Sequence, residues 1–190
     1  TRLTDVTGVQ TGALPISRWN GGDYHTGSVP ARGLAIARMI GHITYLSEES
    51  MHRKFGRRLQ EKEQYGFDFT DQFQVESYLE YQGDKFVERF DANSYIYISK
   101  AMDYFDLGEK YGSLDLAFRR TKAKFLIVSF TSDWLYPPPQ SKEMVFALMK
   151  EGKDVSYAEL ACHHGHDSFL IETERQSKLI TSFLETAYGA

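Results

Sequence analysis

The hydrophobic pattern of this chain changes partway along it, and this change limits the possible folds more than any other feature. Residues 125–130 (FLIVSF) form a short apolar run rich in β-forming side chains, typical of a strand buried on both faces. Pro137 to Pro139 end that strand, an amphipathic helix is predicted over 141–150, and a second strand is predicted over 155–160. Strand, helix and strand in this order predict a parallel βαβ unit with a right-handed crossover.

A terminal helix is expected over 169–188, after a loop over 163–167. Its predicted inward face holds Leu170, Leu179, Ile180, Phe183 and Leu184. The first half of the chain, to about residue 112, lacks strand patterns and is predicted to be helix and loop. Its expected helices cover residues 34–46, 47–55, 71–82, 85–90 and 93–105, with Ser47 as the N-cap of the second.

Residues 6–16 read VTGVQTGALPI, which closely resembles the translation of a common sequencing adapter, with Gly12 where the adapter frame gives Cys. We therefore expect residues 1–17 to be an artefactual or disordered leader and exclude them from fold reasoning. An ordinary flexible terminus is the alternative, because the Gly and Thr content of this segment also fits a loop.

Composition excludes several classes of protein. The 190 residues are 42% hydrophobic, which excludes a wholly disordered chain. Lys and Arg number 22 against 26 Asp and Glu, for a net charge of −4, so no basic excess favours nucleic acid as a partner. The one cysteine, Cys162, fits a reducing compartment. No apolar run approaches the ~20 residues that cross a bilayer, and no signal peptide is recognisable, so we expect a cytoplasmic protein without a membrane partner.

Two polar residues follow the predicted strands, where functional groups of open α/β sheets gather. Asp133 comes three residues after the first strand, and His166 comes six residues after the second. A carboxylate that accepts a hydrogen bond from one imidazole nitrogen leaves the other nitrogen free to act as a base. The pair therefore predicts two members of a catalytic triad, in the acid-then-histidine order of α/β-hydrolases. The alternatives are a turn-forming Asp133 and an exposed loop histidine.

The nucleophile of such a triad is missing. A nucleophile elbow needs the pattern G-x-S-x-G between a strand and a helix, and the chain contains no such pattern. Ser129, Ser132 and Ser168 lie on the strand or in the loops of the predicted acid and histidine, and none is in an elbow. Cys162 is expected to be a small buried apolar side chain.

A zinc site is the rival interpretation of the second loop. Cysteine, histidine and aspartate side chains all bind zinc, and the candidates within six residues are Cys162, His163, His164, His166 and Asp167. Zinc ligands usually come from separated anchors, and His25, His42 and His52 lie at unsuitable spacings. We therefore expect no metal.

Four segments resemble one family in particular. They are WNGGDY from Trp19, GLAIARMIGHITYLS from Gly33, QVESYLEYQGDKFVERFDANSYIYISKAMDYFDL from Gln74, and FTSDWLYPP from Phe130 together with GHDSFL from Gly165. In these segments, and from Arg18 to the end, the chain resembles the homoserine O-acetyltransferases, which have an α/β-hydrolase fold. The resemblance implies a C-terminal fragment, with a helical lid region over 18–115 and the last two parallel strands and their helices over 116–190.

The resemblance also implies roles for four residues. Asp133 matches the acid of the family's triad and His166 its histidine. Arg38 matches the arginine that holds the substrate carboxylate, a task that suits its forked guanidinium. Asp167 matches the residue that takes the substrate ammonium. The alternatives are a plain surface charge for Arg38 and a helix cap for Asp167.

The implied reaction is transfer of an acetyl group from acetyl-CoA to the hydroxyl of L-homoserine, a step of methionine biosynthesis. It follows a Ser-His-Asp ping-pong mechanism, with acetyl-CoA as a substrate and no cofactor, in a protein that is a homodimer when full length. The fragment lacks the nucleophile and is expected to be inactive. The alternatives are a homoserine succinyltransferase, a serine acyltransferase, a hydrolase, or a non-catalytic dimerisation fragment.

Overall fold

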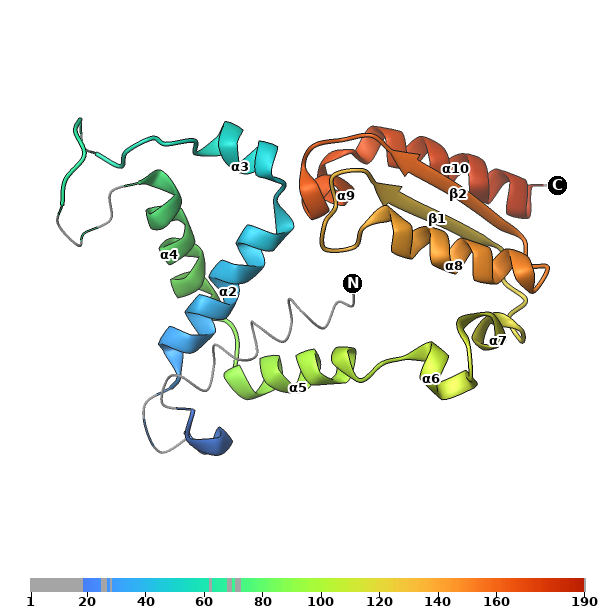
Figure 1. Cartoon of the computed structure of the whole chain (residues 1–190), viewed down its shortest axis with the longest axis horizontal. Helices are drawn as coiled ribbons and strands as arrows, with labels where there is room; N and C mark the ends of the chain where they lie inside the picture. The colour runs from blue at the N-terminus through green and yellow to red at the C-terminus, as the bar shows by residue number, and fades with distance from the viewer. Residues whose placement is uncertain are drawn as a thin grey trace. The chain divides into compact units, whose positions relative to one another are not determined.

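The computed structural model describes residues 19–24, 27, 29–61, 63–67, 70 and 73–189 (Figure 1). The expectations for residues 1–17 and for His25 lie outside these residues. The chain divides into two compact units: unit 1 holds residues up to Thr44 and Glu48–Phe105, and unit 2 holds Tyr45–Ser47 and the residues from Asp106 onward. The lid expected over 18–115 and the part of the α/β-hydrolase core expected over 116–190 are functional assignments, and they stay predictions.

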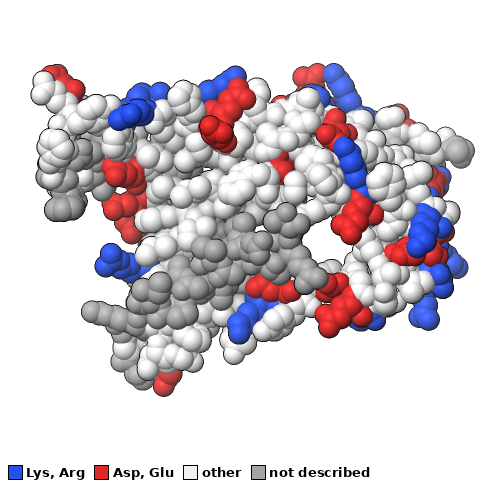
Figure 2. Space-filling model, in the orientation of Figure 1, with Lys and Arg blue, Asp and Glu red and all other residues white. Residues whose placement is uncertain are grey.

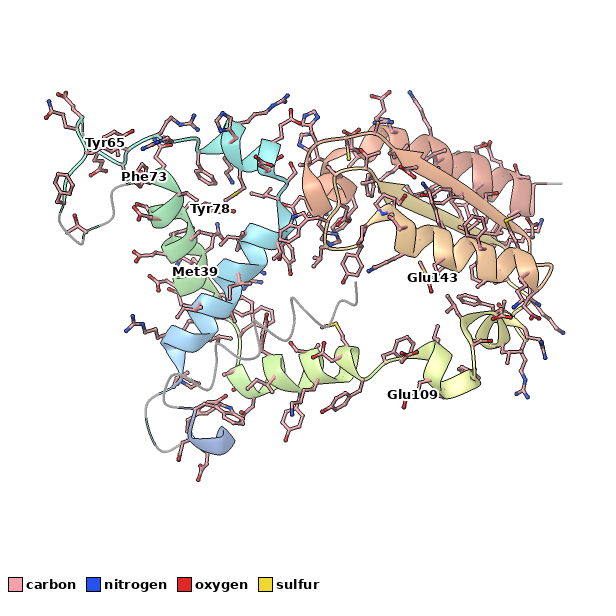
Figure 3. The ribbon with its side chains drawn as sticks, viewed as in Figure 1. Met39, Tyr65, Phe73, Tyr78, Glu109 and Glu143 are labelled. Carbon is pink, nitrogen blue, oxygen red and sulfur yellow. The ribbon has the colours of Figure 1, made fainter. Side chains whose placement is uncertain are left out.

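Unit 1 is built from helices, as predicted. Among the described residues of unit 1, a short turn of 3-10 helix, η2 (Asn20–Gly22), precedes four longer helices. These are α2 (Ala31–Tyr45), α3 (Glu48–Lys54), α4 (Gln74–Val87) and α5 (Ala92–Asp103). An isolated antiparallel bridge joins Leu59 to Phe73 just before α4, and the ring of Tyr65 lies beside that of Phe73 (Figure 3).

Helix α4 corrects one prediction, because it is continuous where two helices were expected over 71–82 and 85–90. Gly83 lies inside it and is buried. A Cβ atom at this position would lie 3.0 Å from Cβ of Ala35 and 3.1 Å from Cε of Met39, a side chain that extends from α2 toward α4 (Figure 3). The glycine therefore gives α2 and α4 room for close contact, and the packing outweighs its low helix propensity.

The core of unit 1 is apolar and includes the segment around η2. Its buried cluster comprises Tyr24, Leu34, Ala37, Phe86, Ala92 and Ile96. The hydroxyl of Tyr24 donates to Oδ1 of Asp91, the residue that caps α5. The indole of Trp19 donates to Oδ1 of Asn93 at 2.8 Å, and the Asn93 amide donates to Gly22 O at 2.9 Å. These bonds hold the WNGGDY segment on the first turn of α5.

Unit 2 contains the predicted βαβ arrangement. Helices α6 (Leu107–Tyr111) and α7 (Leu114–Phe118) come first. Strands β1 (Phe125–Phe130) and β2 (Val155–Leu160) pair in parallel, with Phe125 opposite Val155 and Phe130 opposite Leu160. Helix α8 (Pro138–Lys150) connects them, and η3 (Gly165–Asp167), α9 (Ser168–Ile171) and α10 (Thr173–Tyr188) follow. Helices α8 and α10 flank the sheet, and α9 lies beyond the strands' carboxyl ends (Figure 1). Both strands occupy the predicted residues.

Three details of unit 2 differ from the predictions. Helix α8 starts at Pro138, three residues early, because proline suits the first turn of a helix, where no backbone donor is needed. The terminal helix is divided at Glu172 into α9 and α10. Strand β1 is fully buried only at Ser129 and Phe130, because the sheet of the described residues has only two strands.

The predicted inward face of the terminal helix is also partly wrong. Leu179 and Phe183 line a cavity of about 230 Å³ against the two strands, as an inward face should. Leu170, Ile180 and Leu184 are exposed. A two-stranded sheet is too narrow to cover the whole apolar stripe of a helix of this length.

Charged residues of both signs mix on the surface of unit 2 (Figure 2). Ion pairs join Lys142 to Glu159 at 2.6 Å and Arg119 to Glu151 at 3.1 Å. Such mixing gives no continuous basic area over unit 2 on the face in view. Of the helices within the described residues, none has the length and apolar character that a bilayer span requires.

Candidate active site

The two loops that leave the sheet at its carboxyl end meet in unit 2. The backbone N–H of Thr131, just past β1, donates to Leu160 O at the end of β2 at 3.0 Å. This bond extends the parallel ladder by one step beyond the strands. It brings the loop that carries Asp133 beside the loop that carries His166, as adjacent parallel strands predict.

Asp133 and His166 form a hydrogen-bonded pair. The distance from Oδ2 of Asp133 to Nδ1 of His166 is 2.9 Å. The Asp133 side chain is only 5% exposed, whereas 24% of the His166 side chain remains accessible. Nδ1 is occupied by the carboxylate, and Nε2 makes no hydrogen bond among the described residues. An imidazole held in this way has one nitrogen free to exchange a proton with a bound molecule.

The second oxygen of Asp133 organises its own loop. Oδ1 accepts from the backbone N–H of Leu135 at 3.0 Å and from that of Tyr136 at 2.8 Å. Asp133 therefore does form a turn, as the alternative interpretation expected. The turn uses Oδ1 and the contact with His166 uses Oδ2, so one aspartate makes both. One carboxylate fixes the turn with one oxygen and the imidazole with the other, so the turn sets the direction of the pair.

Aromatic rings surround the His166 imidazole. The ring centroid of Tyr136 lies at 4.9 Å, that of Phe169 at 5.1 Å and that of Tyr45 at 5.7 Å. Burial raises the pKa of Tyr136, and the nearby Tyr45 and Asp133 raise it further, so Tyr136 stays a neutral phenol at physiological pH. These rings limit water around the imidazole without adding charge.

A segment from far earlier in the chain supports both loops. Between α2 and α3, the carbonyl of Leu46 accepts from the indole of Trp134 at 3.1 Å, and the hydroxyl of Ser47 donates to the carbonyl of His163. Ser47 directly precedes α3, where an N-cap was expected. Gly165, with φ of +72°, packs so closely on this segment that a Cβ atom would collide with the backbone N of Ser47. Sequence reasoning missed this support, since it has no local pattern.

Cys162 was predicted to be a small buried apolar side chain, and this prediction was wrong. The side chain is half-buried, and its sulfur lies 3.0 Å from the hydroxyl oxygen of Ser168 and 3.5 Å from that of Ser132. It is therefore a member of a polar cluster rather than a small apolar filler. The remaining serine of the predicted set, Ser129, bonds the hydroxyl of Tyr157 at 2.7 Å.

The candidate zinc ligands turn toward different partners. His164 lies 4.0 Å from Glu172, and its ring lies beside that of His163. Within the ranges that the structure describes, no three His, Cys, Asp or Glu side chains converge as a metal site would require.

Arg38 and Asp167 lie in different units. Arg38 is half-buried on α2 in unit 1, with its guanidinium carbon 5.0 Å from the centre of the Phe86 ring. Asp167 directly follows His166 in unit 2 and precedes α9, but its side chain makes no capping hydrogen bond to that helix. The alternative of a helix cap therefore finds no support for Asp167, and Arg38 packs on an aromatic face rather than extending as a plain surface charge.

Comparison with solved structures identifies the class of fold. The crystal structure of homoserine O-acetyltransferase from Bacillus anthracis matches 96% of this chain and 48% of its own, with a TM-score of 0.85 at 23% identity. The crystal structure of esterase E22 matches 95% of this chain and 50% of its own, with a TM-score of 0.81 at 22% identity. The chain has the fold of part of an α/β-hydrolase, and the predicted fold class is confirmed.

Comparison with known sequences finds relatives among the homoserine O-acetyltransferases. The homoserine O-acetyltransferase of Methanohalobium evestigatum is 56% identical over 170 residues, which are 90% of this chain and 35% of that protein. That of Methanococcus vannielii is 57% identical over 167 residues, which are 88% of this chain and 34% of that protein. No family model matches the chain. Over about nine-tenths of its length the chain is a homologue of these homoserine O-acetyltransferases, and it spans about a third of their length.

Proposed function

We propose that the protein of which this chain forms part transfers an acetyl group from acetyl-CoA to the side-chain hydroxyl of L-homoserine. The observation that carries this proposal is the 56–57% identity to homoserine O-acetyltransferases over a stretch that includes Asp133 and His166. The hydrogen bond between these two side chains supports the same reaction, because acyl transfer by a serine needs an oriented base.

In the first half-reaction, Nε2 of His166 takes the proton of a nucleophilic serine hydroxyl. The serine oxygen forms a bond to the thioester carbonyl carbon, and the carbon–sulfur bond breaks. His166 returns the proton to the departing thiolate, which leaves as CoA. Asp133 holds Nδ1 throughout and stabilises the imidazolium that forms. The product is an acetylated serine.

In the second half-reaction, the hydroxyl of homoserine replaces the thiol. His166 takes its proton, the homoserine oxygen bonds to the acetyl carbon, and the serine oxygen leaves and recovers the proton. Arg38 is proposed to hold the substrate carboxylate and Asp167 the substrate ammonium, by their match to the family. Orientation of the amino acid lets its hydroxyl, rather than water, reach the acetyl group. The reaction needs no cofactor, and the one cysteine fits a reducing, cytoplasmic compartment.

The serine and the oxyanion hole are proposed to come from the part of the relatives that this chain does not match. The 190 residues contain no G-x-S-x-G, and the chain spans 35% of the Methanohalobium evestigatum protein. Nucleophile and oxyanion hole together supply most of the rate enhancement in such enzymes. The isolated chain should therefore release no CoA from acetyl-CoA, and the whole protein should act as a homodimer.

The test is an assay of the protein expressed from the longest reading frame that contains this chain. Release of CoA is measured with acetyl-CoA or succinyl-CoA as donor and with homoserine, serine or water as acceptor. Rapid release with acetyl-CoA and homoserine, lost in His166→Ala and kept in His164→Ala, supports the proposal. Faster release with succinyl-CoA, with serine or with water alone would replace it by one of the related reactions, and no release with any pair would leave a binding role.

A further inference from the structure

Three consecutive residues after β1 each bond to the loop after β2. The side chain of Thr131 donates to Cys162 O at 3.1 Å and accepts from Cys162 N at 3.0 Å, that of Ser132 accepts from Gly165 N at 3.0 Å, and that of Asp133 accepts from His166 at 2.9 Å. The Asp133–His166 pair is therefore the last of a series of bonds between the two loops. Ser132 and Gly165 directly precede the two members of the pair.

Three side chains and the backbone of Gly165 close into a ring of hydrogen bonds, which we call the Gly165 ring. The N–H of Gly165 donates to Oγ of Ser132 at 3.0 Å, and Oγ of Ser132 lies 3.5 Å from Sγ of Cys162. That sulfur lies 3.0 Å from Oγ of Ser168, which donates to the carbonyl of Gly165 at 2.7 Å. The path starts and ends on one residue.

Each proton of the Gly165 ring has one possible direction. A hydroxyl has a single proton, and Ser168 gives its proton to the Gly165 carbonyl, so Ser168 accepts from the thiol of Cys162. The thiol proton is then used, so the sulfur accepts from the hydroxyl of Ser132. The Ser132 oxygen in turn accepts from the N–H of Gly165. All four donors point the same way around the ring, an arrangement in which neighbouring bonds strengthen one another.

The ring surrounds Gly165, whose backbone conformation sets the direction of the chain into His166. Gly165 is buried and has a φ of +72°, a left-handed conformation that only glycine adopts without cost. Ser168 is fully buried, so its hydroxyl has no water to replace a lost partner. The ring satisfies both the N–H and the C=O of Gly165 and so fixes the peptide groups on either side of it. The next residue is His166.

We propose that Ser132, Cys162 and Ser168 are positioning residues that hold the His166 imidazole in register with Asp133 by fixing the backbone of Gly165. This proposal rests on the proposed function, in which His166 acts as the base. The ring also gives Cys162 a definite state: its thiol proton is held by Ser168, so the sulfur is a hydrogen-bonding group and reacts slowly with disulfide reagents.

The first test reads the ring nitrogens of His166 by 15N NMR in the full 190-residue chain, with the signal assigned by its loss in His166→Asn. In the wild type we expect the proton on Nδ1, facing Asp133. Ser132→Ala and Cys162→Ala should reduce the fraction of this tautomer at least about twofold, because the imidazole loses its fixed orientation. Cys162→Ser restores a donor and an acceptor and should restore the wild-type signal.

Ser129→Ala is the matched control. It removes the buried hydroxyl of Ser129 on β1, which is bonded to Tyr157 rather than to the Gly165 ring. It should lower the stability of the chain and leave the His166 signal unchanged. If Ser132→Ala fails to fold, the pair Cys162→Ala and Cys162→Ser decides the question. Wild-type His166 signals in folded Cys162→Ala and Ser132→Ala would overturn the proposal, because the ring would then serve packing alone.

The second test uses the fact that Cys162 is the one cysteine of the chain, so a thiol reagent reports on this side chain alone. The folded chain should react with an aromatic disulfide at least about tenfold more slowly than the chain in denaturant. Ser168→Ala should recover much of that rate while circular dichroism shows a folded chain. Equal rates in the folded and denatured chain would contradict the proposal. Neither test needs acyl transfer, so failure of the proposed function is seen separately in the CoA assay.

Discussion

Unit 1 and unit 2 bury different kinds of side chain. Among the described residues, the buried side chains of unit 1 are mostly apolar: Tyr24, Leu34, Ala35, Ala37, Phe55, Phe86, Ala92 and Ile96, with Thr44 and Ser99 as the polar exceptions. Those of unit 2 are divided evenly, with Phe130, Val145, Leu148 and Leu160 against Ser47, Ser129, Asp133 and Ser168.

The difference suggests that the two units have different tasks. Burial of a polar side chain is tolerated only where hydrogen bonds replace the lost water. In unit 2 each buried polar side chain has such partners, and Asp133 accepts three bonds with its two oxygens. Acid–base chemistry needs polar side chains held in fixed directions. Helix packing needs apolar side chains whose shapes fit one another. We therefore expect variants of Asp133 and His166 to act on the proposed proton transfers, and variants of the apolar core of unit 1 to act first on stability.

The largest expected effect comes from the Asp133–His166 pair. If the proposed function holds, His166→Ala or Asp133→Asn in the whole protein should lower kcat/KM for acetyl transfer by about 10⁴-fold, since either change removes a member of the proposed triad. The free energy of unfolding should change far less. Steady-state kinetics and urea denaturation of the same preparations check both statements. A loss of activity that only follows a loss of folded protein would remove the distinction between the units.

The two tryptophans allow each unit to be followed separately, because Trp19 lies in unit 1 and Trp134 in unit 2. Leu34 is fully buried in unit 1 and Leu148 is 1% exposed in unit 2. Leu34→Ala should lower the stability reported by Trp19 in a Trp134→Phe background by about 3–5 kcal/mol, as the lost contacts and the new cavity require. Leu148→Ala should act similarly on Trp134 in a Trp19→Phe background. Equal responses of both reporters to both variants would mean that the units unfold as one.

The pH dependence of unit 1 should reflect His42. Burial, and then the charges of Arg38 and Lys54, lower the pKa of His42 from 6.5 to about 4. Above pH 6.5 the imidazole is neutral in both states and the stability is complete. Between pH 6.5 and 4 His42 binds a proton in the unfolded chain but not in the folded chain. The free energy of unfolding therefore falls by about 2–3 kcal/mol over this range.

Urea denaturation followed by Trp19 between pH 7 and pH 4 measures this loss. His42→Phe is the control, because it removes the titrating group and should flatten the profile in this window. A profile in which His42→Phe loses as much stability as the wild type would assign the effect to other groups.

The smallest expected effect concerns the cap of α6. Oδ1 of Asp106 accepts from the backbone N–H of Glu109 at 2.9 Å. Asp106→Ala should lower the stability reported by Trp134 by about 1 kcal/mol, because a first-turn donor loses its partner. Asp106→Asn keeps an acceptor at the same position and should behave nearly as the wild type. An equal loss of stability in Asp106→Asn and Asp106→Ala would point to the charge rather than to the cap.

Much of the fold could be predicted because its signals are local. Both strands lie where the short apolar runs of residues 125–130 and 155–160 place them, and their parallel pairing follows from the helix between them. The same topology predicts that Asp133 lies beside His166, and the two side chains are hydrogen-bonded. The errors were also local in origin: Gly83 favours a break that α2 packing prevents, and the proline run begins helix α8 as well as ending the strand.

The rest of the site depends on groups that side-chain patterns do not display. The Gly165 ring uses a backbone N–H and C=O together with the direction of three side-chain protons. The contact of Ser47 with His163 joins residues 116 positions apart, and no period or spacing in the sequence marks it. Sequence reasoning can name the candidate site residues, but the groups that orient their side chains appear only in three dimensions.

The place of Tyr45–Ser47 in unit 2 has a consequence for dissecting the molecule. The polypeptide enters unit 2 for three residues, leaves it for the length of α3, α4 and α5, and returns at Asp106. A fragment cut at the obvious linker before Asp106 would lose the backbone against which Gly165 packs. Unit 2 is therefore a discontinuous folding unit. Its last contacts form across a large loop, which raises its contact order and delays its completion until the two distant segments have met.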